Sequence, residues 1–385
     1  MRTVTLGEVC RIESGGTPSR KDPGNFGGQI PWVKIGDMLQ GQVTGTAETI
    51  SETGLSTSTA KLWPAGTLLV SIFATIGRTA VLGIPASSNQ AIAGLQVDPK
   101  QADTSYLRHF LDASVGLLSA SGRGIAQNNI NLSMLKAWRV PLPPLDEQRR
   151  IAAILDNADE LRTKRRQALA HLDTLTQSIF QRMESEVSSV PRMKLAEVCI
   201  RIQTGPFGSL LHKGDYVDGG VPLVNPMHIR DGKIVADSSF SVSVAKFTDL
   251  ESFRLLAGDV VLGRRGEIGR CAEVLESHGP MLCGTGSLII RPSAKHLVST
   301  YLCAVLSGRE ARNRLTGAAQ GATMLNLNTK IVGNLEIAVP PLELQQAFAT
   351  RVAAVERLKE THRKHLAELD ALFASLQDRA FKGEL

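Results

Sequence analysis

The feature that most constrains this chain is a long stretch without proline or glycine that occurs twice. The first copy begins Pro143-Pro144-Leu145-Asp146-Glu147-Gln148 and runs to Met183, and the second begins Pro340-Pro341-Leu342-Glu343-Leu344-Gln345 and runs to Phe381. In both copies apolar residues recur every three or four positions, which predicts one apolar stripe along a long amphipathic helix. The prolines stand just before each helix, where a fixed φ and a missing N–H are best tolerated.

Two such helices can bury their stripes on each other. The segment between them leaves the C-terminal end of the first helix and enters the N-terminal end of the second. If that segment is compact, these two ends must be close, which favours antiparallel packing. At 1.5 Å per residue each helix would be roughly 55 Å long. We therefore expect a rigid antiparallel coiled-coil spacer with the two remaining segments at its opposite ends.

The duplication extends to the whole chain. Leu6-Gly7-Glu8-Val9-Cys10 matches Leu195-Ala196-Glu197-Val198-Cys199, and Ile76-Gly77-Arg78 matches Ile268-Gly269-Arg270. The repeated unit is a globular segment followed by a long helix, as in other internal repeats that preserve order along the chain. We predict a pseudo-twofold repeat with four parts: a first globular domain at 1–142, a spacer helix at 143–186, a second globular domain at 187–339 and a second spacer helix at 340–385.

Each globular half is predicted to be mixed α/β and rich in short strands. Apolar or β-branched runs bounded by glycine, proline and polar turns indicate strands at 31–35, 67–73 and 80–82. One short helix is expected in each half, at 104–119 and at 297–314. The loops that follow, 121–129 and 317–323, carry small hydrogen-bonding side chains. Such loops suit either close contact with a ligand or simple exposure to solvent.

The composition and motifs favour a binding module over an enzyme. A net charge of +6 suits a polyanionic partner. The five cysteines form no CxxC pair, which predicts reduced thiols and no metal site. P-loop, HExxH and GxSxG motifs are absent. The run Asn225-Pro226-Met227-His228 is similar to the Asn-Pro-Pro-aromatic loop of amino-methyltransferases, but it lacks the second proline and the stacking ring.

The start of the chain, Met1 to Glu8, lacks the apolar core of a signal peptide. No apolar run is long enough to cross a membrane. We therefore expect a cytoplasmic location and no membrane partner.

The motifs together resemble the DNA-specificity subunit of Type I restriction–modification systems. The resemblance covers the whole chain and is carried by Leu6-Gly7-Glu8-Val9, Ser14-Gly15-Gly16-Thr17-Pro18-Ser19, Ile30-Pro31-Trp32-Val33, the segment from Pro141 to Ile151, and the ending Ala380-Phe381-Lys382-Gly383-Glu384-Leu385. The second copy departs from the pattern, because Leu344 replaces the glutamate and Gln346 replaces the arginine.

This resemblance implies that the globular halves are target recognition domains, each reading one half of a bipartite site on double-stranded DNA. It further implies that the helices fix the distance between the halves and dock two adenine methyltransferase subunits, which restriction/translocase subunits then join. The specificity subunit itself is non-catalytic in this family. S-adenosylmethionine, ATP and magnesium belong to its partners, and it has no cofactor of its own.

Reading base edges requires Arg, Lys, Asn, Gln, Ser or Thr at the grooves, with backbone contacts setting the register. The candidates in the first domain are Thr17, Ser19, Lys34, Arg78, Arg123, Gln127 and Asn128. The candidates in the second are Lys213, Asn225, His228, Arg264, Arg265, Arg270, Gln320 and Thr323. Arg78 and Arg270 occupy equivalent positions, so we expect them to hold phosphate or the framework. The other loops differ between the halves, which suits two different half-sites.

Three alternatives stay open from the residues. The basic cluster in the middle of the helices (Arg162, Lys164, Arg165 and Arg166, with Lys359, Arg363 and Lys364) could face DNA, dock a partner or simply be solvated. The whole chain could be a scaffold that holds recognition modules for protein partners. It could also be an enzyme with an unfamiliar motif. Salt-dependent binding of duplex DNA separates the DNA-binding hypothesis from the scaffold.

The pair Arg264-Arg265 is the sharpest single candidate, for a guanine or phosphate contact. We predict that Arg265→Ala weakens DNA binding or relaxes the sequence of the second half-site, because one cationic donor is lost. Binding assays and the pattern of methylated sites would check this. Wild-type affinity together with an unchanged methylation pattern would contradict it.

Overall fold

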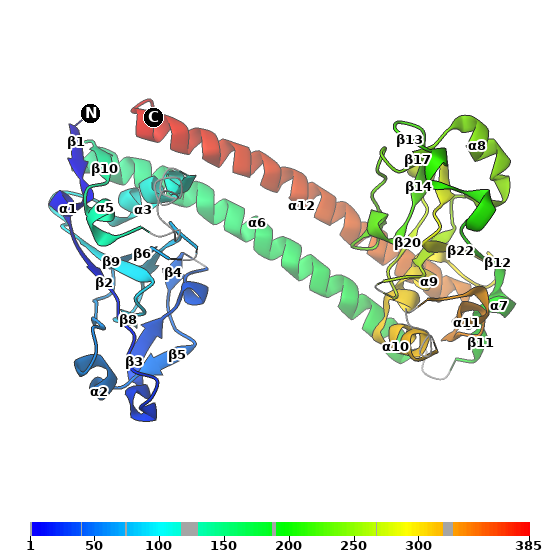
Figure 1. Ribbon diagram of the computed structural model, residues 1–385, viewed down its shortest axis with the longest axis horizontal. Coiled ribbons are helices and arrows are strands. Elements are labelled where there is room, and N and C mark those ends of the chain that lie inside the picture. Colours follow the sequence, from blue (N-terminus) through cyan, green and yellow to red (C-terminus); the bar gives the residue numbers. More distant parts are fainter. Residues whose placement is uncertain are drawn as a thin grey trace. The chain divides into compact units, whose positions relative to one another are not determined.

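The computed structural model describes residues 2–39, 41–73, 75–116, 130–186, 190–266, 268–318 and 326–385. The chain divides into two compact units, Met1–Ala168 with His362–Leu385, and Leu169–Thr361. Each unit therefore contains one globular domain together with part of both long helices (Figure 1). The expected mixed α/β class with an internal repeat is confirmed.

The two long helices are α6 (Leu145–Glu186) and α12 (Leu342–Lys382). Each begins directly after its proline pair, as the sequence predicts. Within the first unit, Arg162 Nε donates to Asp370 Oδ1 at 2.6 Å. Within the second, Lys359 Nζ lies 2.9 Å from Asp173 Oδ1. In the first unit Arg150 contacts Leu385 whereas Arg162 contacts Asp370. In the second unit Asp173 contacts Lys359 whereas Phe180 contacts Phe348. Residue numbers thus rise along α6 while those of the partners fall along α12 within each unit, so the helices run antiparallel there, as expected.

The basic cluster in the middle of the helices is largely neutralised by carboxylates. Arg162 pairs with Asp159 as well as with Asp370, and Arg166 lies 3.0 Å from the same Asp370 carboxylate. Lys359 is only 6% exposed. Hydrogen bonds to Asp173 and Glu356 raise the pKa of Lys359, although burial opposes them as the largest single influence. Arg162 and Lys359 therefore belong to the packing between the helices, whereas Lys164, Arg166 and Lys364 remain exposed.

The first globular domain is built on the sheet β2-β9-β6-β7-β4. Its strands are β2 (Cys10–Ser14), β9 (Ile92–Val97), β6 (Leu68–Ser71), β7 (Thr79–Leu82) and β4 (Gln42–Val43). A smaller sheet contains β5 (Glu48–Ile50), β3 (Phe26–Val33) and β8 (Ser87–Ser88), and β1 (Arg2–Thr5) pairs with β10 (Arg139–Leu142). The helices are α1 (Leu6–Val9), α2 (Glu52–Ser56), α3 (Thr104–Ala113) and α5 (Leu132–Lys136).

The second globular domain repeats this plan with the sheet β12-β22-β19-β20. Its strands are β12 (Cys199–Thr204), β22 (Ser287–Pro292), β19 (Val260–Gly263) and β20 (Cys271–Glu273). A second sheet contains β13 (Tyr216–Val217), β17 (Ser241–Val242), β14 (Val221–Val224), β21 (Met281–Cys283) and β18 (Arg254–Leu255). The strand pairs are β11 (Arg192–Lys194) with β23 (Glu336–Ala338) and β15 (Ile229–Arg230) with β16 (Lys233–Ile234). The helices are α7 (Leu195–Val198), α8 (Val244–Asp249), α9 (Ser299–Ser307), α10 (Arg309–Ala318) and α11 (Thr329–Gly333).

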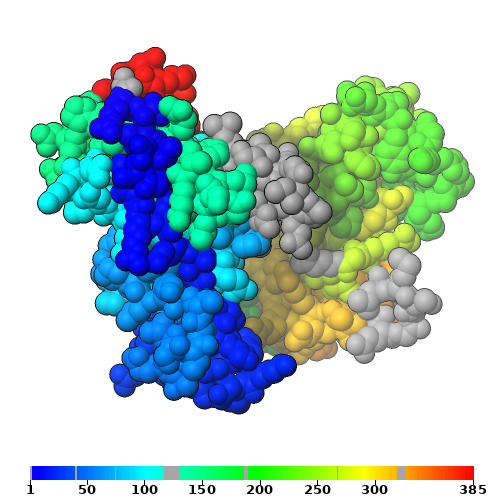
Figure 2. All heavy atoms as spheres, turned by 60° about the vertical axis from the view of Figure 1, so that its left-hand side comes forward, coloured from blue at the N-terminus to red at the C-terminus, as the bar shows by residue number. Residues whose placement is uncertain are grey.

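The core of the first unit joins the globular domain to both long helices. Leu68, Leu95 and Tyr106 of the domain share one apolar cluster with Leu155 of α6 and Phe373 of α12. The end of α12 therefore belongs to this core, and it lies beside β1 in the views of the first unit (Figures 1 and 2). The second unit has the corresponding arrangement, in which Met183 of α6 and Phe348 of α12 join the core around Leu288.

The departure of the second copy from the helix-start pattern has a structural counterpart. Arg150 donates to both oxygens of Glu147, at 2.9 and 2.7 Å, and to the backbone oxygen of Leu385 at 2.6 Å. The start of α6 thus holds the last residue of the chain. Leu344 and Ala347 stand at the matching positions of α12 and cannot form such a clasp.

Three secondary-structure predictions were wrong in detail. Of the helix expected at 104–119, α3 ends at Ala113, with Ser114 as its C-cap, and residues 117–119 lie outside the described residues. The single helix expected at 297–314 is broken into α9 and α10 at Gly308, whose backbone is extended (φ −65°, ψ 154°). Glycine is a poor helix former, which weakens the helix at that point. The strand expected at 31–35 ends at Val33, because the Asp37 carboxylate accepts the Lys34 N–H at 2.8 Å and starts a 3-10 turn.

We predict that Phe373→Ala destabilises the chain by about 3–5 kcal/mol, as truncation of a buried phenylalanine does. Phe373 is 8% exposed, and its ring centroid lies 4.2 Å from the Arg162 guanidinium and 5.9 Å from the His109 ring. The matched control is Leu372→Ala, because Leu372 is 51% exposed and should lose only about 0.5 kcal/mol. Urea unfolding of both variants measures this, and equal losses would contradict the packing described.

Candidate nucleic-acid interface

A rigid loop follows β2 in the first domain. The Gly15 N–H donates to Ile92 O and the Gly16 N–H donates to Ser88 O, both at 2.9 Å. The indole N–H of Trp32 donates to Gly16 O at 3.1 Å. A Cβ atom on Gly15 would lie 2.2 Å from the Ser88 hydroxyl oxygen, so only glycine fits there. This anchoring presents Thr17 and Ser19 on the surface, where both side chains are exposed.

A cationic cluster lies beside this loop, and we call Arg20, Lys34 and Glu48 the Glu48 cluster. The Glu48 carboxylate accepts hydrogen bonds from Lys34 Nζ and, at 2.8 Å, from Arg20 Nη2. These bonds, first that from Lys34 and then that from Arg20, hold the pKa of Glu48 below its ordinary value. The Arg20 guanidinium lies 4.6 Å from the Phe26 ring centroid, and Lys34 Nζ lies 5.6 Å from that of Trp32. The two cations and one carboxylate leave the Glu48 cluster with one net positive charge, and both cations lie against aromatic rings.

The remaining candidates of the first domain are less constrained. The Thr17 hydroxyl donates to the side-chain oxygen of Gln90, and Gln90 is also exposed. Arg78 is half-buried and directly precedes β7. The predicted residues Arg123, Gln127 and Asn128 lie outside the described residues.

In the second domain, Arg264 and Arg265 directly follow β19. Arg264 Nε donates to Asn326 Oδ1 at 3.0 Å, and the backbones of Arg265 and Asn326 form an antiparallel bridge. Burial, and then the neighbouring Arg265 charge, lower the pKa of Arg264. Arg265 itself is exposed. Arg264 therefore fixes the turn while Arg265 points its charge to solvent. Gln320 and Thr323 lie outside the described residues.

Two other candidates of the second domain have structural roles in the 3-10 turn that follows β14. Asn225 Oδ1 accepts the Gly286 N–H at 3.1 Å. His228 is 2% exposed, its Nδ1 lies 2.8 Å from Leu223 O, and its ring centroid is 5.2 Å from that of Phe240. The side chain of His228 is thus enclosed by its own domain rather than presented to a ligand.

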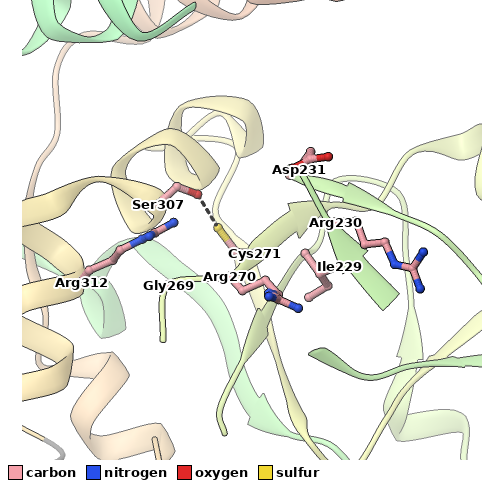
Figure 3. A pocket seen from close by; sticks show the side chains of 9 residues that line it. Ile229, Arg230, Asp231, Gly269, Arg270, Cys271, Ser307 and Arg312 are labelled. Atoms are coloured by element: carbon pink, nitrogen blue, oxygen red, sulfur yellow. Dashed lines mark hydrogen bonds between the residues drawn. The ribbon is translucent and has the colours of Figure 1, made fainter. Parts of the chain in front are cut away.

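The last two candidates differ in their surroundings. Lys213 is exposed on a 3-10 turn. Arg270 Nη1 donates to Pro226 O at 3.3 Å and lines an open cavity of about 420 Å³. The cavity is also lined by Ile229, Arg230, Asp231, Gly232, Gly269, Cys271, Ser307 and Arg312. Figure 3 shows the Arg312 side chain extending towards Ser307, while the Arg230 guanidinium extends away from them.

Sequence reasoning missed Arg20, Glu48 and Gln90. Arg20 directly follows the run Ser14–Ser19 that the sequence analysis singled out, so its cationic type was a usable signal. Glu48 and Gln90 are distant in sequence from Lys34 and Thr17, and no local pattern connects them. Across the described residues, no group of three or more His, Cys, Asp or Glu side chains could hold a metal ion. Within the same part of the chain, no helix combines the length and apolarity needed to span a membrane.

Comparison with known proteins places these features in a family. Residues 1–171 and 192–371 match the family described as Type I restriction modification DNA specificity domain. The EcoBI specificity subunit of Escherichia coli is 22% identical over 414 aligned positions, which cover 99% of this chain and 85% of that protein. The MjaVIII specificity subunit of Methanocaldococcus jannaschii is 22% identical over 327 positions, which cover 79% of this chain and 75% of that protein.

A solved structure shares the fold. The S subunit of a Type I restriction–modification system from M. genitalium superposes with a TM-score of 0.63 at 15% identity, covering 99% of this chain and 96% of that one. The chain therefore belongs to the Type I restriction–modification DNA specificity family, whose members recognise DNA and leave the chemistry to other subunits.

Proposed function

We propose that this chain reads a bipartite site on double-stranded DNA, with one half-site for each globular domain and a gap set by the paired helices. The observation that carries the proposal is the duplication of a domain-plus-helix unit whose two copies share a framework but carry different exposed loops. Equivalent frameworks favour equivalent placement on a duplex, and unlike loops favour unlike base sequences.

The two exposed surfaces offer different chemistry for reading bases. In the first domain the Glu48 cluster and Thr17 combine cations, a carboxylate acceptor and a hydroxyl. In the second domain Arg265 offers a guanidinium, which suits the O6 and N7 acceptors of guanine or a phosphate. Asn225 and His228, whose side chains form hydrogen bonds within the domain, would support the exposed residues of the second surface.

The helices suit the role of a spacer. α6 has 42 residues and α12 has 41, so each is roughly 60 Å long at 1.5 Å per residue. A duplex rises about 3.4 Å per base pair. The spacer would therefore limit the separation of the domain centres to about eighteen base pairs, and the unread gap would be shorter because each domain reaches inward.

Exposed leucines on the helices support two equivalent docking surfaces. In the first unit Leu161 and Leu372, each 51% exposed, lie next to the Arg162–Asp370 pair. In the second unit Leu358 and Leu175, 51% and 44% exposed, lie next to the Lys359–Asp173 pair. The two sets occupy matching positions of the repeat. Apolar side chains exposed in matching sets suit two copies of one partner.

We propose that these partners are two adenine methyltransferase subunits, with restriction/translocase subunits joining the complex. In this scheme S-adenosylmethionine, ATP and magnesium are bound by the partners. The place of action would be the cytoplasm, where the DNA to be read lies. A scaffold that binds only proteins is the alternative, and duplex binding that weakens with rising salt separates the two.

For the Arg265→Ala variant, the structure sharpens the expected result. Loss of a guanine contact should weaken binding of the cognate site by about 1–3 kcal/mol and relax one base of the second half-site. Arg309→Ala is a suitable control, because Arg309 is an exposed arginine on α10 of the same domain. Equal effects of the two variants would mean that only bulk charge matters.

Lengthening the spacer should lengthen the gap. Seven residues inserted after Ala168 in α6 and after Thr361 in α12 preserve the apolar stripes over about two turns. They add roughly 10 Å, which corresponds to about three base pairs. Methylation mapping should then show both half-sites unchanged and a longer gap. Seven residues inserted after Ser58, in the first globular domain, provide the control and should leave the gap unchanged. Altered half-sites in the spacer variant would contradict the spacer role.

Introducing negative charge on one docking surface should prevent one methyltransferase subunit from binding. The double variant Leu161→Glu, Leu372→Glu should give a complex with a single methyltransferase subunit, because buried carboxylates oppose docking. Native mass measurement of the purified complex counts the subunits. Leu62→Glu is the control, since Leu62 is 51% exposed but lies in the first globular domain. A full complement of partners in the double variant would exclude this surface.

A further inference from the structure

One buried glutamine occupies the same place at the start of each long helix. Gln148 of α6 is 1% exposed and Gln345 of α12 is 0% exposed. A glutamine is seldom buried to this degree unless its amide is satisfied by hydrogen bonds. The two residues close the motif that begins with each proline pair, so the repeat itself singles them out.

In the first unit the amide of Gln148 joins the helix to the segment that precedes α3. Its Oε1 accepts the Asp103 N–H at 2.9 Å, and its Nε2 donates to Gln101 O at 3.2 Å. The same Nε2 donates to Pro143 O at 2.9 Å. One side chain thus links the proline turn, the helix and the globular domain.

In the second unit the amide of Gln345 makes the same three bonds. Its Oε1 accepts the Val298 N–H at 2.9 Å, and its Nε2 donates to His296 O and to Pro340 O, both at 2.8 Å. The segment bonded is the one that precedes α9, the counterpart of α3. The arrangement is therefore reproduced on the other copy of the repeat, bond for bond.

The residues directly flanking the glutamine differ between the two copies. Glu147 is replaced by Leu344, and Arg149 is replaced by Gln346. The helix starts therefore differ on both sides of the glutamine, while the buried amide and its partners are the same. A buried tyrosine supports each junction, since Tyr106 donates to Pro141 O at 2.7 Å and Tyr301 donates to Ala338 O at 2.8 Å.

We propose that Gln148 and Gln345 are positioning residues that set the gap length of the bipartite site, by fixing the angle at which each domain sits on its own spacer helix. The inference rests on the proposed function. A helix of given length defines a distance only if the domain at its end is held at one angle. Only a side chain with an acceptor and two donor hydrogens on one rigid amide can satisfy all three backbone groups at once. An apolar side chain there would leave those buried groups unpaired, so other angles would become comparable in free energy.

The test compares apolar replacements of similar length at buried and exposed glutamines of the same helices. The variants that remove the buried amide, which we call the lock variants, are Gln148→Met and Gln345→Met. The controls are Gln167→Met and Gln346→Met, where the replaced glutamine side chains are exposed. Each full-length chain is co-produced with its methyltransferase subunits. Methylation is then measured on duplexes that carry the native half-sites at the native gap, or at a gap shorter or longer by one base pair.

The wild type and both controls should strongly prefer the native gap. In each lock variant the ratio of methylation at the native gap to that at the altered gaps should fall by about tenfold, equivalent to about 1.4 kcal/mol, while the bases read in each half-site stay the same. A role in stability alone would lower the melting temperature and the yield without moving this ratio. If a methionine variant does not fold, Gln→Glu at the same position, which keeps the acceptor but lacks the donors, is scored in its place.

A folded lock variant whose gap preference equals that of the wild type would overturn the inference while leaving the proposed function intact. If instead the wild type recognised no two-part site at any gap, the proposed function itself would fall, and the positioning role with it.

Discussion

The architecture depends on the burial of the apolar residues near both ends of α6 and α12, because these ends complete the cores of the domains. The stripes are not buried along their whole length, since Leu161 and Leu358 are each 51% exposed. Leu155 near the start of α6 and Phe373 near the end of α12 lie in the first core, whereas Met183 and Phe348 lie in the second. Each helix is therefore shared by both compact units. A chain built this way ties its two domains to one pair of helices through apolar contacts, the largest favourable contribution to folding.

Polar contacts then determine the angles and the register. Asp156 illustrates this in the first unit, where its carboxylate accepts from Ser105 and lies 2.8 Å from both Arg108 and His109 of α3. These hydrogen bonds and charges lower the pKa of Asp156 to about 2, although burial opposes them. The contact ties α3 to the first third of α6, and Ala353 stands at the matching position of α12. In the second unit a different pair ties the domain to its helix, because Lys233 Nζ lies 2.8 Å from Glu356 Oε2. The two units thus share a plan but differ in the polar contacts that hold each domain along its helix.

The sequence predicted the large elements well because their signals are periodic or repeated. The helix starts, their direction and the duplicated domain plan follow from spacing alone. Details that depend on contacts between distant residues could not be predicted in this way. The burial of His228 depends on Phe240, and the neutralisation of Arg162 depends on Asp370, which is far away in the sequence. The break at Gly308 was visible as a glycine within the expected helix, but its effect depended on the backbone conformation adopted there.

The same distinction applies to the candidate site. Residue type identified Lys34 and Arg265 as donors suited to DNA, and the structure places both where solvent reaches them. Their surroundings were not foreseeable: Glu48 bridges two cations in one domain, and Asn326 braces the arginine turn in the other. The most direct test of the account is a map of methylated adenines in cells that contain this chain and its methyltransferase. The account predicts one motif made of two unlike half-sites at a single fixed gap, lost when this chain is deleted. A continuous motif, or methylation that persists without the chain, would contradict it.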